Sequence, residues 1–246
     1  MLEIKNLNLH LGKKHVLKDI NLTLPIQGEI IGIMGPNGAG KSSLFKSLIG
    51  EFKATGEQLL NQQPLSSVLK SITYIPQKAH IDLDFPIGVE AVILSGSYGN
   101  IGWFKPVTKK VKSRLESLLT TLELNDLRHR QISEISGGQL QRVLVARALM
   151  HSNQVYMLDE PFVGIDFHSE QLIFNLLQHL KSENKLILIV HHDLSKATQY
   201  FDRIILLNRT IRFFGDSDIA MQPEQLNQTF LNAEPSALIS DEKSVQ

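Results

Sequence analysis

Residues 35 to 42 read Gly35-Pro36-Asn37-Gly38-Ala39-Gly40-Lys41-Ser42. The apolar residues 30–34 before this run predict a buried strand, and the apolar positions within 43–49 after it predict a helix. A glycine-rich turn at the N-terminus of a helix lets backbone amides converge on phosphate oxygens. The run is therefore typical of a P-loop, the phosphate-binding loop of nucleotide-binding proteins.

The chemistry of this loop predicts separate roles for its residues. Lys41 is expected to reach the β- and γ-phosphates, and Ser42 to offer its hydroxyl to Mg²⁺. The alternative is a glycine-rich turn with an ordinary lysine beside it, which the flanking strand and helix disfavour. The residues expected to bind ATP are Gly35, Pro36, Asn37, Gly38, Ala39, Gly40, Lys41, Ser42 and Ser43.

Two acidic residues follow the apolar run 155–158. In P-loop proteins an acid at the end of a strand holds Mg²⁺, directly or through water, which assigns Asp159 to the metal. Glu160, one residue later, is expected to polarise the attacking water, as a positioned carboxylate does in hydrolysis. Acids at strand ends are also common turn formers, but the P-loop earlier in the chain favours the catalytic interpretation.

Composition limits the function classes. The chain has 246 residues, 42% of them hydrophobic, which is enough for a full core. Its net charge of +0 predicts no nucleic-acid partner, and the lack of cysteine excludes disulfides and thiolate sites. No apolar run approaches the roughly 18 residues of a membrane span, and the N-terminus lacks the apolar core of a signal peptide. We expect a cytoplasmic chain.

The hydrophobic pattern divides the chain into regions. Alternating apolar residues within 2–24 predict antiparallel strands around a turn at 12–14, and short apolar runs such as 186–190 predict buried parallel strands. Helical periodicity in the middle predicts an inserted helical lobe over about 85–150. The expected domains are 1–220, containing this lobe, and a loose polar C-terminal tail over 221–246.

A second candidate anion site follows the P-loop in sequence. It is formed by Ser136, Gly137, Gly138 and Gln139, before an expected helix over 140–150. One nucleotide does not need two such seats, so we expect this one to serve ATP held by another copy of the chain. The alternative is a serine that only caps its helix.

Taken together, the P-loop, Ile135-Ser136-Gly137-Gly138-Gln139 and Leu158-Asp159-Glu160-Pro161 resemble the ATPase subunit of an ATP-binding cassette (ABC) transporter. The resemblance covers about residues 1 to 215. It implies an α/β fold: a P-loop NTPase (RecA-like) core with a parallel sheet, an N-terminal antiparallel β subdomain and an inserted helical lobe. It also implies a homodimer that hydrolyses ATP with Mg²⁺ and drives integral membrane permease subunits from the cytoplasmic face of the inner or plasma membrane.

The resemblance adds three site residues. It implies that Gln77 senses Mg²⁺ and couples to the membrane subunit, that His192 contacts the γ-phosphate, and that Asp166 links the two copies. The catalytic set is then Glu160, His192 and Gln77, and the Mg²⁺ set is Ser42, Gln77 and Asp159.

Some positions differ from the usual family pattern. Ile135 replaces leucine and Gly164-Ile165 replaces Ala-Leu, and both changes keep apolar character. Leu11 is the more consequential, because an aromatic residue usually stacks on adenine there. Either His10 or His15 is the candidate to replace it.

The segment His191-His192-Asp193 has a second interpretation, as a set of metal ligands. Neighbours in an extended segment point to opposite faces, so the two histidines do not easily share one ion. We therefore favour the γ-phosphate role for His192.

The substrate class rests on a further resemblance. The segments Asp84-Phe85-Pro86-Ile87, Gly96 to Phe104 and His191 to Leu194 resemble the branch that imports manganese, zinc or chelated iron, which implies a solute-binding protein as an indirect partner. The alternative for the aromatic residues within 98–104 is a loop anchored on the helical lobe. The alternative functions are import of a non-metal substrate, a soluble ABC-type ATPase in cofactor assembly or repair, and an ATP-binding module without turnover, which Glu160 disfavours.

Overall fold

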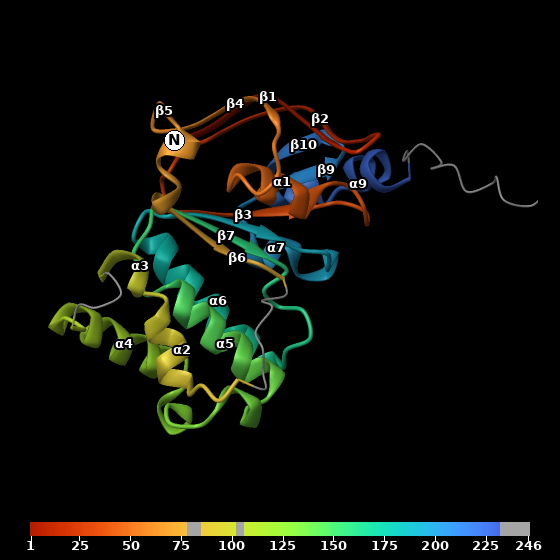
Figure 1. Ribbon diagram of the computed structural model, residues 1–246. Helices are drawn as coiled ribbons and strands as arrows, with labels where there is room; N and C mark the ends of the chain where they lie inside the picture. The colour runs from red at the N-terminus through yellow and green to blue at the C-terminus, as the bar shows by residue number, and fades with distance from the viewer. Residues whose placement is uncertain (78–84, 102–105, 232–246) are drawn as a thin grey trace, which may run out of the picture.

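A computed structural model describes residues 1–77, 85–101 and 106–231 of the protein. Its centre is a six-stranded sheet in the order β10-β9-β3-β8-β7-β6 (Figure 1). All neighbouring strands are parallel except β10, which is antiparallel to β9. The strands are β3 Glu29–Met34, β6 Ile72–Ile75, β7 Val155–Asp159, β8 Leu186–Val190, β9 Arg203–Asn208 and β10 Thr210–Asp216.

A second sheet of four strands covers one face of this one. It is antiparallel, in the order β2-β1-β4-β5, and the helix after the P-loop, α1, packs into the same core (Figure 1). The expected antiparallel pair at the N-terminus and the parallel core are both confirmed. These elements are β1 Leu2–Leu11, β2 Lys14–Leu24, β4 Thr55–Leu60, β5 Gln63–Pro64 and α1 Lys41–Leu48.

Successive side chains of the central strands point to opposite faces, so the sheet separates two hydrophobic cores. Ile31 and Ile33 of β3 join the core of the antiparallel sheet and α1, whereas Ile30 and Met34 join the core of the helices below. Both faces are buried, which explains why these strands are continuous apolar runs.

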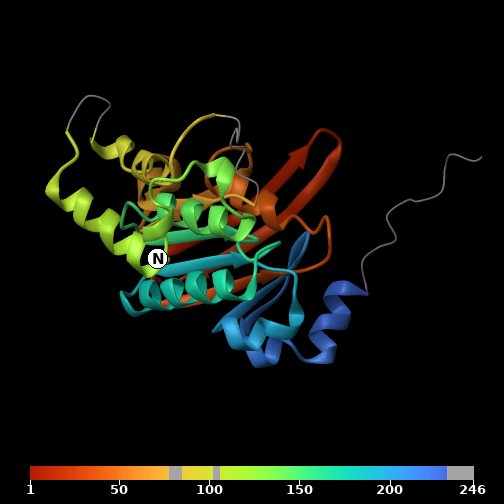
Figure 2. The same cartoon turned by 90° about the horizontal axis from the view of Figure 1, so that it is seen from below.

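Helices form the other layer. The elements in the described part of 85–150 are helical, and they share their core with α6 and the sheet (Figures 1 and 2). Viewed from below, the yellow and green helices of this part lie away from the blue C-terminal helices (Figure 2). The α-helices of this layer are α2 Val89–Ser95, α3 Tyr98–Ile101, α4 Lys109–Thr121, α5 Gly137–Ala148 and α6 Phe167–Ser182. Two short 3₁₀ turns, Asn125–Leu127 and Ile132–Glu134, lie between α4 and α5.

The C-terminal region differs from the expected loose tail. Residues 223–230, within the expected polar tail of 221–246, form helix α9 (Pro223–Phe230). Pro223 suits the first turn of a helix, and the buried Thr229 offers its carbonyl oxygen to Asn208 Nδ2 at 2.9 Å. The polar composition concealed this contact with β9. Two short helices come before α9 in the chain: α7 Ala197–Tyr200 and α8 Ser217–Ala220. Residues 232–246 lie outside the described residues.

Within the described ranges, none of the helices has the length and apolar character needed to cross a bilayer.

Candidate functional site

The P-loop joins β3 to α1, as its flanking patterns predicted. Gly35 has φ 153° and Gly40 has φ 100°, backbone conformations that side chains disfavour. A Cβ at Gly35 would collide with the Leu207 carbonyl oxygen, and one at Gly40 would lie 2.6 Å from Leu17 Cδ2. The loop therefore needs glycine at both positions to fit between β9 and β2.

Lys41, the first residue of α1, is buried inside this loop. Its Nζ donates hydrogen bonds to the carbonyl oxygens of Gly35 at 2.8 Å and Pro36 at 3.0 Å. Burial lowers the pKa of Lys41, and the carboxylates of Glu160 and Asp159 oppose that shift. The site thus contains a desolvated cation enclosed by its own loop.

Ser42 and Asp159 meet beside this lysine. The Ser42 hydroxyl donates to Asp159 Oδ1 at 3.0 Å, at the end of β7. Burial raises the pKa of Asp159, and the bond from Ser42 acts in the opposite direction. Hydroxyl and carboxylate oxygens are hard donors of the kind that Mg²⁺ takes, so these two residues fit that ion.

Tyr74 is a residue of this site that the sequence did not reveal. Burial, together with the nearby Asp159, raises the pKa of the Tyr74 phenol to about 12. Tyr74 lies on β6, which is hydrogen-bonded to β7 at Met157. No motif marks it, because the contact depends on the order of strands in the sheet.

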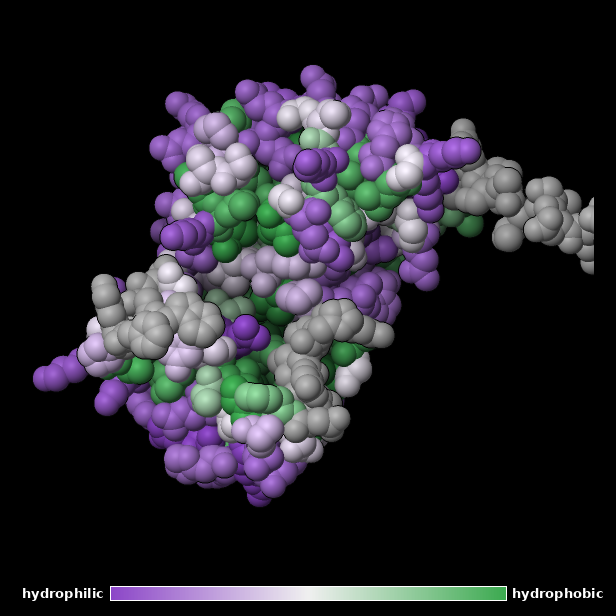
Figure 3. Space-filling model, in the orientation of Figure 1, coloured by the Kyte–Doolittle hydropathy of each residue, from purple (hydrophilic) through white to green (hydrophobic). Residues whose placement is uncertain are grey.

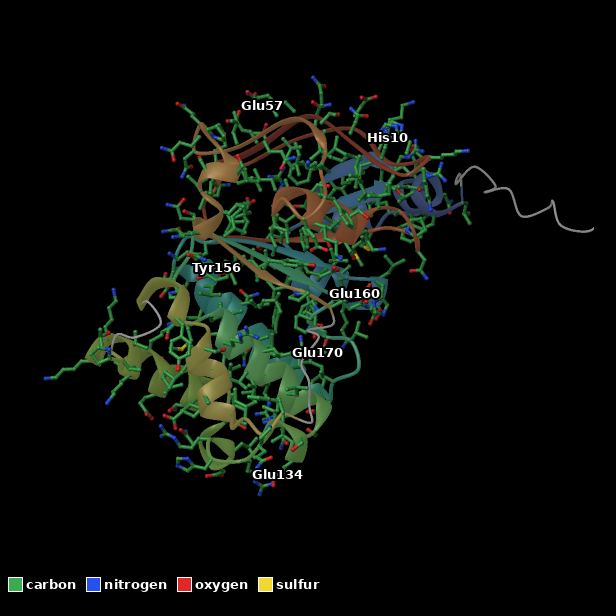
Figure 4. The ribbon with its side chains drawn as sticks, viewed as in Figure 1. His10, Glu57, Glu134, Tyr156, Glu160 and Glu170 are labelled. Carbon is green, nitrogen blue, oxygen red and sulfur yellow. The ribbon has the colours of Figure 1, made fainter. Side chains whose placement is uncertain are left out.

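Glu160 follows directly after β7, and Figure 4 shows it at one end of the central strands. Its φ of 51° is an uncommon left-handed conformation, held by a hydrogen bond from its amide to the Val190 carbonyl at 3.1 Å. Gln77 Nε2, just beyond β6, donates to Glu160 Oε2, and His192 Nδ1 lies 4.0 Å from the same oxygen. The structure thus brings together all three residues of the expected catalytic set.

The neighbouring histidines have opposite environments. The His192 side chain is 54% exposed, whereas His191 is buried against Phe162, Tyr200 and Phe201. Burial lowers the pKa of His191 to about 4. Asp193 accepts hydrogen bonds from the amide and hydroxyl of Ser195, and the described residues contain no cluster of three or more His, Cys, Asp or Glu that could hold a metal. The geometry therefore does not assemble these three side chains around an ion.

The second anion seat begins α5. Ser136 Oγ accepts from the Gln139 amide at 3.3 Å, and Gln139 Oε1 accepts from the Ser136 amide at 2.9 Å, which is a capping box. Figure 4 shows Glu134, two residues earlier, at the far end of the helical layer from Glu160. Within one chain this seat is therefore separate from the P-loop site.

Asp166 lies directly beside that seat. It caps α6 by accepting from the Ser169 amide at 2.9 Å and the Ser169 hydroxyl at 2.8 Å. A Cβ at Gly138 would collide with Asp166 Oδ2, so the two segments pack without a side chain between them.

The candidates for base stacking pair with each other. The rings of His10 and His15 stack with centroids 3.9 Å apart, and His15 Nε2 lies 3.1 Å from Asn8 Oδ1. Leu11 is 40% exposed.

The chain is similar to known proteins over most of its length. Residues 17–163 match the family model described as ABC transporter. The chain is 41% identical over 230 residues to "Manganese transport system ATP-binding protein MntB" of Halalkalibacterium halodurans, covering 94% of this chain and 92% of that one. It is 43% identical over 207 residues to "Zinc transport system ATP-binding protein TroB" of Treponema pallidum, covering 84% and 77%.

Solved structures match across almost the whole chain. One is cbiO1 of Clostridium perfringens, part of the transporter complex cbiONQ, at 26% identity and a TM-score of 0.75, covering 92% of both chains. Another is a dimeric ATP-binding cassette in a post-hydrolysis state bound to ADP and phosphate, at 25% identity and a TM-score of 0.74, covering 88% of this chain and 99% of that one.

Proposed function

Because the chain belongs to the ABC transporter family, we propose that its ATP hydrolysis drives import of a divalent metal ion, manganese, zinc or iron, through a separate permease. Membership of this family shows the general activity, which is ATP hydrolysis coupled to transport. The observation that carries the catalytic proposal is the meeting of Lys41, the Ser42–Asp159 pair and the Glu160–Gln77 pair at one edge of the sheet.

We propose a separate task for each of these residues. Lys41 offsets the charge of the β- and γ-phosphates, exchanging its bonds to loop carbonyls for bonds to phosphate oxygens. When bound at Ser42, Asp159 and Gln77, Mg²⁺ supplies further charge neutralisation. Glu160 orients the attacking water and accepts its proton, while the hydrogen bond from Gln77 holds the carboxylate in place. His192, whose Nδ1 lies 4.0 Å from the same oxygen, is expected to contact the γ-phosphate. Catalysis rests on positioning and electrostatics.

The assembly is also a proposal. We expect two copies to face each other, so that Ser136 to Gln139 of one copy completes the P-loop site of the other, with Asp166 at the contact between them. The position of Ser136 to Gln139 at the start of α5 supports this, because a helix N-terminus attracts anions. The chain would then bind its permease at the cytoplasmic face of the membrane. A solute-binding protein would deliver the substrate to the permease from the opposite face.

A groove beside Gln77 supports the permease as a partner. A cavity of about 500 Å³ lies between β6 and the helices, with Pro76, Leu144 and Arg147 among its lining residues. Figure 3 shows a hollow between the upper and lower parts of the molecule, with hydrophobic side chains along it. A permease segment in this groove would press on the residues next to Gln77 and so reach Glu160.

Growth of a deletion strain tests the substrate class. We expect a defect that excess manganese, zinc or iron relieves, and that the intact gene complements but the Glu160→Gln variant does not. Uptake of the corresponding radioactive ion should fall in parallel. Rescue by a sugar or amino acid, with metal uptake unchanged, would contradict metal import and leave the ATPase activity standing.

A further inference from the structure

A second cavity, of about 500 Å³, is lined in part by the P-loop. Its lining includes Pro36 and Gly38 of this loop, the start of β2, and the turn between β9 and β10. Four of its lining residues are basic: Lys14, Lys18, Arg209 and Arg212. Among the residues that the structure describes, no aspartate or glutamate lines it.

These cations are not neutralised by the protein. No side chain of the four forms an ion pair or a side-chain hydrogen bond with any described residue. The chain as a whole has a net charge of +0, so four unpaired cations around one cavity are a local concentration of charge. Such a group repels itself and is stabilised by a bound polyanion.

The position of the cavity relative to the P-loop indicates which part of a bound polyanion would occupy it. Ser42 and Asp159 mark the side of the loop toward β8 and β7, where the terminal phosphate and its metal are expected. The cavity lies on the other side of β3, toward β9. There, the Arg209 amide donates to the Ala39 carbonyl at 2.9 Å, and the Lys18 amide donates to the Arg209 carbonyl at 2.8 Å. A triphosphate lying along the loop would therefore place its α-phosphate and nucleoside in the cavity.

The walls are poor at recognising a base by stacking. No Phe, Tyr or Trp of the described chain lines the cavity. His15 does line it, but its ring is stacked on His10 and bonded to Asn8. Charge attracts phosphate whatever base is attached, and a guanidinium plane stacks on any base.

We propose that this cavity holds the α-phosphate and the nucleoside of the nucleotide. Lys14 and Arg212 bind the phosphate by charge, and the Arg212 guanidinium plane stacks on the base in place of an aromatic ring. The chain then selects the polyphosphate and accepts both ATP and GTP. This inference rests on the proposed P-loop site, and it adds two nucleotide-binding residues to that site.

Equilibrium binding to the intact chain tests the proposal, with ATP, GTP and ADP measured at low and moderate salt. We expect wild-type affinities for ATP and GTP within about threefold of each other, since neither base gains a specific hydrogen bond. The double variant Lys14→Gln/Arg212→Gln should lose roughly tenfold in affinity for both at low salt, with a weaker salt dependence. Lys13→Gln removes the same charge from the same turn without touching the cavity and should change neither.

Two results would overturn the inference: ATP preferred over GTP by more than about tenfold in the wild type, or unchanged affinities in the double variant. Leu11→Tyr adds an independent arm, because an aromatic ring beside the cavity should raise purine affinity and restore a base preference. Lys41→Ala separates this proposal from the one beneath it. If Lys41→Ala binds ATP as tightly as the wild type, the P-loop site itself is wrong and the cavity assignment falls with it.

Discussion

The hydroxyl of Ser42 lies 3.0 Å from Asp159 Oδ1, although 117 positions separate the two residues in the chain. Ser42 lies in the first turn of α1, and Asp159 is the last residue of β7. They meet because β8 alone lies between β3 and β7 in the sheet. The pair places two hard oxygen donors beside the buried Lys41 ammonium.

This pair predicts the metal dependence of hydrolysis. Asp159→Asn removes the charge that holds the cation, so we expect at least about a 100-fold loss of ATPase activity and a higher Mg²⁺ requirement. Ser42→Thr keeps the hydroxyl and should stay within a few-fold of the wild type. Mg²⁺ titration of the steady-state ATPase rate measures both. An Asp159→Asn variant with an unchanged Mg²⁺ curve would refute the assignment.

Lys41→Ala should weaken ATP binding by roughly 100-fold, because it removes a buried cation that can make charge-assisted hydrogen bonds to phosphate. Lys46→Ala is the matched control: it lies on the same helix but pairs with Glu51 at 2.9 Å. Calorimetric titration with ATP compares the two variants, and a thermal unfolding scan checks that Lys41→Ala is folded. Near wild-type affinity in a folded Lys41→Ala chain would count against its role.

Glu160→Gln keeps the shape of the side chain and removes the charge that directs water. We expect ATP binding to persist, hydrolysis to fall by about 100-fold or more, and a dimer to accumulate with ATP. Gel filtration with and without ATP, beside a turnover assay, reports each effect. A folded variant that remains monomeric with saturating ATP would argue against two copies closing around the nucleotide.

Local chemistry explains what the sequence could predict. Three patterns depend on residues close together in the chain: the P-loop, the apolar strand before Asp159 and the N-terminal alternation. The observed strands and α1 lie where these patterns predicted them. The family comparisons confirm the P-loop α/β fold. The roles assigned to individual residues stay predictions, though the structure places Gln77, Glu160 and His192 together.

Features that depend on strand order were not predictable from one sequence. Tyr74 approaches Asp159 only because β6 pairs with β7, and Arg209 reaches the P-loop only because β9 pairs with β3. Helix α9 was missed for a related reason. Its polar composition suggests a tail, whereas its order comes from tertiary contacts such as the bond from Asn208 to the Thr229 carbonyl.

Burial of His191 predicts how stability changes with pH. Its pKa is about 4 in the folded protein against 6.5 for the ordinary side chain, so the unfolded chain binds more protons between these values. Stability should therefore fall as the pH drops from 6.5 toward 4, by up to about 3 kcal/mol from this residue. Urea unfolding at several pH values in this range measures the slope.

His191→Phe is the control for that slope. Phenylalanine suits a pocket formed by Phe162, Tyr200 and Phe201 and does not titrate, so the variant should lose less stability on acidification. The charged neighbours that also act on His191 remain in both proteins, which isolates the ring; they are His192, Asp193, Glu170 and Lys196. Equal slopes in the two proteins would show that His191 does not control this transition.

The last prediction concerns the separation of Ser136 from the P-loop. If the seat at the start of α5 completes the site of the partner copy, then Lys41→Ala and Ser136→Arg should each be inactive alone but recover activity when mixed. In a heterodimer of one of each, both lesions fall in the same site, because the Lys41→Ala P-loop faces the Ser136→Arg helix. The other site keeps an intact P-loop and an intact serine.

Distinct affinity tags allow heterodimers to be isolated before the ATPase rate is measured. Ser133→Arg, on the exposed turn before the seat, controls for the added charge. Activity near half of the wild type supports two independent shared sites. Background activity in verified heterodimers would reject independent shared sites. The number of ATP molecules bound per heterodimer then separates the two remaining models. One bound ATP indicates shared sites that hydrolyse ATP only together, and none indicates sites confined to one chain.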